Sequence, residues 1–162
     1  MSAEAQCAAC TLTLSVDLFH CSHSMKTAPI LTTVHVVFAL LFVTFAWLQR
    51  NDIDPAVYYK PSSLDAALWL AFYLLIAVLF VTAVFKRIPR WLLILSMLFC
   101  LVEMVITGPG LFENLFGEQD FSMAQVSMSS EDPRVELSRE FFGAVIALAA
   151  VVFLFVQQRK PK

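Results

Sequence analysis

The chain has 162 residues, of which 59% are hydrophobic and only 15% are charged, with a formal net charge of −2. Ordinary soluble domains carry roughly 25% charged residues. Together with a mean hydropathy of +0.75, these values exclude an ordinary soluble domain. No basic patch of the kind that binds nucleic acid is present, so the expected partner is the lipid bilayer.

Residues 1–24 precede the apolar part of the chain and do not resemble a secretory signal, because a basic n-region is missing and Asp17 interrupts the apolar stretch. We predict a poorly ordered N-terminal extension followed by a four-span domain at 25–162, and a true start at Met25, with residues 1–24 upstream of it, is the alternative. The N-terminal extension contains cysteine and histidine residues, which are zinc ligands in other proteins. Their spacing matches no standard zinc site, so metal binding stays open. Those residues are Cys7, Cys10, His20, Cys21 and His23.

Four long apolar blocks make up most of the remaining chain. Each has about the length of a helix that crosses the hydrocarbon layer. The blocks are apolar all round, whereas the helices of a soluble bundle would each carry a polar stripe. We therefore predict an all-α fold, a four-transmembrane-helix bundle. The predicted spans are about 30–48, 66–85, 91–107 and 141–158, with an outer loop at 108–140.

Basic residues next to the spans predict the orientation, since short loops rich in Lys and Arg stay on the cytoplasmic side. Seven of the eleven basic residues fall before the first span, between the second and third, or after the fourth. The third connection instead holds two basic residues and seven acids. We expect both termini to be cytoplasmic, in the cell membrane. The seven residues are Lys26, Lys86, Arg87, Arg90, Arg159, Lys160 and Lys162.

Local signals predict where the helices begin and end. Ser62-x-x-Asp65 has the form of a capping box that opens the second helix. Gly108-Pro109-Gly110 predicts the end of the third helix, because glycine and proline do not continue a helix well. Asp132 followed by proline predicts that the fourth helix begins at Pro133 and projects past the membrane. Residues 122–130 are predicted to form a flexible connection.

The outer side is predicted to bring two polar groups together, one from the first hairpin and one from the start of the last helix. Glu136 and Glu140 share a helix face and would repel each other without a nearby cation. An ion pair between Arg139 and Asp52 or Asp54 would pin the hairpin to the helix. A divalent-cation cage and independent solvated groups are the alternatives. The candidate cluster is Asn51, Asp52, Asp54, Glu136, Arg139 and Glu140.

Two short motifs lie in this cluster. They read Leu48-Gln49-Arg50-Asn51-Asp52-Ile53-Asp54-Pro55, followed by Trp69 and Tyr73, and Glu136-x-x-Arg139-Glu140-x-x-Gly143. With these motifs and the predicted topology, the chain resembles the transmembrane protein 220 family from about Met25 to Gln158. The resemblance implies an integral membrane protein and brings no established biochemical activity.

Two ionisable residues fall inside the predicted spans. Glu103 is costly within a span and is expected to face a partner or a water-filled cavity, either as a proton- or cation-handling group or as a protonated packing residue. His35 lies only about 7.5 Å into the first helix from the cytoplasmic side. Pairing with Glu103 is therefore not expected, and a structural hydrogen bond is the favoured interpretation over a switching role.

Small residues at Gly143, Ala147 and Ala150 line one face of the fourth helix and allow another backbone to approach closely. Internal packing, a homo-oligomer contact and docking on a larger membrane complex all fit this stripe, and the sequence does not choose among them.

No nucleophile elbow, phosphate loop or His-rich metal motif is present, so we expect no enzyme activity and no cofactor. The leading hypothesis is a small accessory or helper membrane protein that acts through helix packing and the outer polar cluster. The alternative is an oligomeric carrier of ions or small solutes that uses Glu103 and the outer carboxylates. A metal-dependent membrane enzyme is a third, weaker hypothesis.

Overall fold

A computed structural model describes residues 29–50, 52–55, 57–59 and 61–159. Each long helix in it is built from one of the apolar blocks. The helices are α2 (Pro29–Gln49), α3 (Ser63–Phe85), α4 (Arg90–Phe116) and α5 (Arg134–Arg159), with a short 3₁₀ helix η1 (Gln125–Ser127) between the last two. All four long helices are apolar and long enough to cross a membrane. The predicted all-α four-helix bundle is confirmed.

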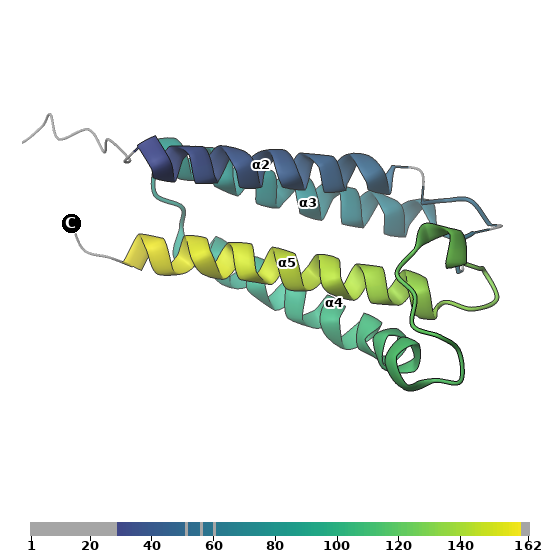
Figure 1. Cartoon of the computed structure of the whole chain (residues 1–162). Helices are drawn as coiled ribbons and strands as arrows, with labels where there is room; N and C mark the ends of the chain where they lie inside the picture. Colours follow the sequence, from purple (N-terminus) through teal and green to yellow (C-terminus); the bar gives the residue numbers. More distant parts are fainter. Residues whose placement is uncertain (1–28, 51, 56, 60, 160–162) are drawn as a thin grey trace, which may run out of the picture.

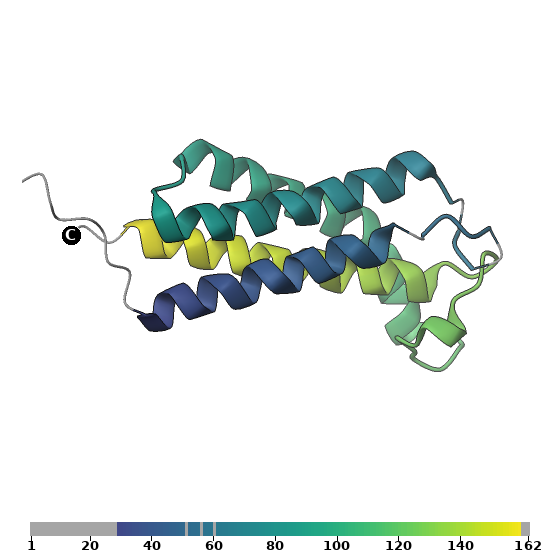
Figure 2. The same ribbon diagram turned by 90° about the horizontal axis from the view of Figure 1, so that it is seen from above.

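The helices form two antiparallel pairs, α2 with α3 and α4 with α5, which lie one above the other (Figure 1). Contacts between α3 and α5 join the pairs. We call the end with the connections 50–62 and 117–133 the loop end, and the opposite end the terminal end. Seen from above, α2 begins and α5 finishes at the terminal end (Figure 2).

Aromatic rings pack both within the α2–α3 pair and between the two pairs. Phe38 and Phe42 of α2 stack on Phe80 of α3, with ring centroids 4.9 and 6.2 Å apart. Phe72 of α3 meets Phe99 of α4 at 4.5 Å, which links the second helix to the third. Inside the bilayer the hydrophobic effect does not drive helices together, so their association depends on close packing, to which these ring contacts contribute.

The terminal end is closed by two glutamine side chains of α5. Gln157 Oε1 lies 2.8 Å from Nε2 of His35, a fully buried residue of α2. Gln158 Oε1 accepts a hydrogen bond from the backbone N–H of Ile88 at 3.0 Å, in the α3–α4 connection. Nδ1 of His35 has no hydrogen-bond partner among the described residues. His35 thus ties α2 to α5 and lies at the opposite end from the outer polar cluster.

The predicted end of the third helix at Gly108 is wrong, and with it the predicted extent of the outer loop. Helix α4 continues through Pro109 to Phe116, so the loop comprises only residues 117–133. One proline removes a single helical hydrogen bond. Close packing offsets that loss, since Gly110 is buried directly against Leu137 of α5.

Helix starts agree better with the sequence. Ser62 caps α3, and its hydroxyl accepts a hydrogen bond from the N–H of Leu64 at 3.2 Å. Asp132 Oδ1 accepts one from the N–H of Arg134 at 3.2 Å, where α5 begins. The start predicted at Pro133 is therefore confirmed to within one residue. The N-terminal extension and its cysteine and histidine residues lie outside the described residues.

Candidate functional site

A pocket of about 340 Å³ opens at the loop end, where the sequence predicts the polar cluster. Its lining comes from the end of α2, the α2–α3 connection, α3, the α4–α5 loop and α5. The polar residues among those that line it are Gln49, Asp52, Tyr58, Tyr73, Gln125, Glu136, Arg139 and Glu140.

The pocket brings together four of the six residues of the predicted cluster. Asp52 from the connection and Glu136, Arg139 and Glu140 from the first turns of α5 all line it. Asn51 lies outside the described residues. Asp54 is not a lining residue. Its backbone carbonyl instead accepts hydrogen bonds from the N–H groups of Val57 and Tyr58, at 3.1 and 3.0 Å, and so shapes the connection.

Two hydrogen bonds fix the connection at the mouth of the pocket. The hydroxyl of Tyr58 donates to Oδ1 of Asp52 at 2.6 Å. The backbone N–H of Tyr59 donates to Oε2 of Glu136 at 2.7 Å, which joins the α2–α3 hairpin to α5. The pinning predicted for the hairpin is therefore present, but it runs through Glu136 and a backbone amide. Arg139 donates instead to Sδ of Met128 at 2.9 Å and acts on Asp52 through its charge.

Burial controls the titration of the two groups that face each other at the mouth. It raises the pKa of Asp52 above its ordinary value, although the hydrogen bond from Tyr58 and the charge of Arg139 oppose the change. Burial likewise raises the pKa of the Tyr58 hydroxyl, and the neighbouring carboxylate of Asp52 adds to the effect. Tyr58 therefore remains a hydrogen-bond donor at neutral pH.

A pH dependence of stability follows from Asp52. Because its pKa is raised in the folded state, its contribution to stability is full below the unfolded value of about 3.9 and is lost as pH rises through the folded value. Asp52→Asn removes this titration but keeps an acceptor for Tyr58. We expect the melting temperature of the variant in detergent, relative to the parent, to increase as pH rises from 4 to 8. A difference that stays constant with pH would contradict the burial of this carboxylate.

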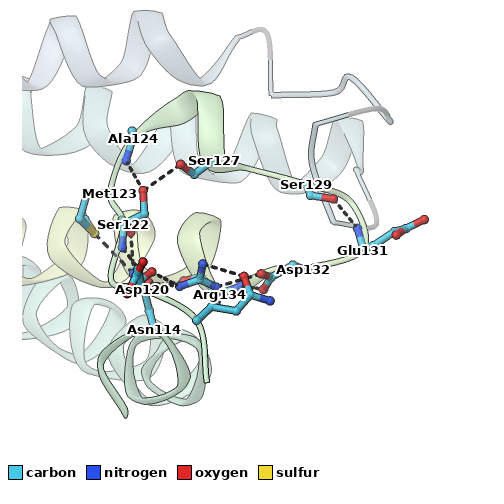
Figure 3. A network of polar contacts seen from close by, with 12 residues as sticks. Asn114, Asp120, Ser122, Met123, Ala124, Ser127, Ser129, Glu131, Asp132 and Arg134 are labelled. Carbon is cyan, nitrogen blue, oxygen red and sulfur yellow. Dashed lines mark hydrogen bonds and ion pairs between the residues drawn. The ribbon is translucent and has the colours of Figure 1, made fainter. Parts of the chain in front are cut away.

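The roof of the pocket comes from the α4–α5 loop, which reaches across toward the α2–α3 pair (Figure 1). Met123, Gln125 and Met128 line the pocket from this segment. The sequence predicts a flexible connection here, whereas the structure shows a loop fixed by side-chain hydrogen bonds to the helices below it (Figure 3).

Arg134 is the centre of these hydrogen bonds. Only 7% of this residue is exposed. Its guanidinium donates to Asp132 Oδ2 at 2.9 Å, Asn114 Oδ1 at 2.7 Å, the Asp120 carbonyl at 2.9 Å and Gln119 Oε1 at 2.9 Å. One planar guanidinium, with five donors in a fixed fork, thus joins α4, the loop and α5.

Asn114 carries the same network into the loop. Its amide donates to the Ser122 carbonyl at 2.7 Å and to Ser138 Oγ at 3.0 Å, while its Oδ1 accepts from the N–H of Ser122 at 3.2 Å. Sequence reasoning missed this network. One signal was available, because an arginine in the first turn of a helix opposes the helix dipole and so needs a partner elsewhere.

The other predicted residues lie away from the pocket mouth. Glu103 is half-buried in α4 and does not line the pocket. Ala147 and Ala150 are buried inside the chain, and the hydroxyl of Tyr73 occupies the space where a Cβ of Gly143 would lie. The small-residue stripe therefore serves internal packing. Among the described residues, no group of three or more His, Cys, Asp and Glu side chains could hold a metal ion.

Fold and site together define a multi-pass helical membrane protein that has an amphipathic pocket at the loop end. The model of the family "Transmembrane family 220, helix" matches residues 41–156. The chain therefore belongs to transmembrane family 220, and the predicted resemblance is confirmed. The match covers the second half of α2, all of α3 and α4, most of α5 and every residue that lines the pocket. Neither curated proteins nor solved structures gave a match.

Proposed function

We propose that this protein is a small accessory protein of the cell membrane that works by binding rather than by catalysis, with the loop-end pocket as its recognition site. The observation that carries the proposal is the pocket itself, which combines charged and apolar side chains within about 340 Å³. Concave sites of this size, mostly apolar with a few converging polar groups, are typical of ligand recognition.

The arrangement of the polar groups favours binding over chemistry. Asp52 and Glu136 already accept hydrogen bonds from the connection, so they fix the shape of the pocket. The carrier hypothesis needs a path between Glu103 and the outer carboxylates, and Glu103 does not line this pocket. Recognition at the loop end requires only the geometry described.

The basic residues support an orientation for the bundle. Lys86, Arg87 and Arg90 lie in or next to the short connection at the terminal end, the position that the positive-inside rule assigns to the cytoplasm. In the proposed orientation the pocket opens at the opposite, outer surface of the membrane, and both ends of the chain are cytoplasmic.

Blocking the pocket tests the proposal. Leu48 lines the pocket, yet 57% of it is exposed, so Leu48→Trp should add bulk at the entrance without overpacking the core. Native mass spectrometry of the full chain, extracted gently from its own membrane, should show a bound ligand or partner mass. We expect Leu48→Trp to reduce the retained fraction at least tenfold, a loss of about 1.4 kcal/mol in binding.

A matched control is available on the same helix. Leu40 is 63% exposed and does not line the pocket, so Leu40→Trp adds the same indole two turns away. It should retain the bound mass. Equal retention by both variants, or no bound mass on the parent chain, would overturn the proposal.

A further inference from the structure

The wall of the pocket joins the lipid-facing surface of the bundle. Leu48, Phe142 and Ile146 line the pocket and are 57%, 41% and 39% exposed. They belong to helices that are apolar enough to cross the membrane. A hydrocarbon chain lying in the bilayer can therefore rest against this wall and still continue into the pocket mouth.

The charges at the mouth are unequal. Three carboxylates, on Asp52, Glu136 and Glu140, line the pocket together with one guanidinium, that of Arg139. Asp52 and Glu136 accept hydrogen bonds from Tyr58 and Tyr59. The side chain of Glu140 makes no hydrogen bond or ion pair that would satisfy it within the described part of the chain.

A half-buried carboxylate without a partner takes up a proton to avoid an unpaired charge, and a cation that enters the pocket would stabilise its charged form in place of that proton. The surrounding rings favour the same kind of ligand. Phe45, Tyr58 and Tyr73 also line the pocket, and an ammonium group is attracted to the faces of aromatic rings. Arg139 supplies the single positive charge, which suits a phosphate.

Resting on the proposed recognition role of this pocket, we propose that its occupant is a membrane phospholipid with a primary-amine headgroup. The ammonium pairs with the carboxylate of Glu140 in a mouth that Asp52 and Glu136 also make acidic, the phosphate pairs with Arg139, and an acyl chain follows the apolar wall. A primary ammonium has N–H donors for the Glu140 carboxylate, whereas a choline group has none. The pocket therefore prefers an ethanolamine to a choline headgroup.

Lipid titration of the purified full chain tests the ligand class. Native mass spectrometry with phosphatidylethanolamine, phosphatidylcholine and phosphatidylglycerol of identical acyl chains should show tightest retention of the first. We expect about tenfold weaker binding of phosphatidylcholine, since hydrogen bonds to charged groups are lost. Phosphatidylglycerol, which lacks the amine, should bind more weakly still.

Dodecylamine serves as a second probe, because competition by this single-chain amine would assign recognition to the ammonium without the phosphate.

Variants separate specific binding from the general lipid shell. Glu140→Gln should weaken phosphatidylethanolamine binding about tenfold, and Arg139→Gln should weaken both zwitterionic lipids together. Glu118→Gln is the matched control, because Glu118 is an exposed carboxylate of the α4–α5 loop that does not line the pocket. Melting temperatures near that of the parent show that the variants are folded, and Leu48→Trp serves as a second test of the same pocket.

Equal retention of the three lipids by the parent chain, or an equal effect of Glu118→Gln and Glu140→Gln, would overturn the proposed ligand class. The proposed function fails separately. If Leu48→Trp removes the native bound mass while the lipids bind without preference, the pocket is still a recognition site, but its occupant is not an amine lipid.

Discussion

Replacing Arg134 with methionine should destabilise the protein more than any other single change at the loop end. Arg134→Met keeps a similar volume but removes the guanidinium, so Asn114 Oδ1, Gln119 Oε1 and Asp132 Oδ2 each lose the hydrogen bond that it donates. Breaking a buried charged pair from one side costs about 3 kcal/mol or more. Reversible unfolding in detergent should show a loss of that size.

Two further variants define the origin of this loss. Arg87→Met changes an exposed arginine of the α3–α4 connection and should alter stability by no more than about 0.5 kcal/mol. Arg134→Lys keeps the charge but loses the planar fork, so it should recover only part of the stability. If Arg134→Met were no more costly than Arg87→Met, the network would not fix the pocket roof.

Adding one methyl group at Gly110 should also have a large effect. A Cβ at this position would lie 2.7 Å from Leu137 Cδ1 and closer still to its Cβ. Helices α4 and α5 would have to separate at this contact. Overpacking of this kind costs about 1 to 3 kcal/mol, which the unfolding of Gly110→Ala in detergent measures.

The matched control lies two residues earlier in the same helix. At Gly108 the nearest atom to an added methyl group would be Phe141 Cε2 at 3.8 Å, an ordinary contact. Alanine also has the higher helix propensity, so Gly108→Ala should be neutral or slightly stabilising. Equal destabilisation by both changes would indicate a general intolerance of α4 near Pro109 and not a specific contact with Leu137.

Helix number and helix starts followed from the sequence because they depend on local properties. The length and apolar content of each block were sufficient for the four spans, and the caps at Ser62 and Asp132 marked two starts. The end of α4 was mispredicted because local rules treat Gly108-Pro109-Gly110 as a helix stop. The contact between Gly110 and Leu137 depends on residues 27 positions apart, which no local rule includes.

The site was predictable in part for the same reason. Asp52, Glu136, Arg139 and Glu140 were found from charge and predicted topology, since both hairpins return to the same surface. The partners of these side chains were not. Arg139 meets the sulfur of Met128, and Glu136 accepts a backbone N–H, choices that depend on the fold of the loop.

Buried residues with polar atoms gave the weakest sequence signal. Tryptophan near the end of a span is typical of the membrane interface, but Trp69 is 4% exposed and packs on Tyr73 inside the bundle, with ring centroids 5.5 Å apart. Trp47 and Trp91, at opposite ends of the bundle, are 61% and 66% exposed, as interfacial residues should be. Composition predicts where an aromatic ring can lie, while packing decides which ring is buried.

The central claim is that this protein presents a recognition pocket at the outer surface of the membrane. Labelling of single cysteines in intact cells is the most direct test of that claim. In a chain whose four cysteines are replaced by alanine, Gln125→Cys places one thiol on the exposed pocket roof, and Arg87→Cys places one at the terminal end. A membrane-impermeant maleimide should label the first variant in intact cells and the second only after permeabilisation. The reverse pattern would place the pocket in the cytoplasm and contradict recognition at the outer surface.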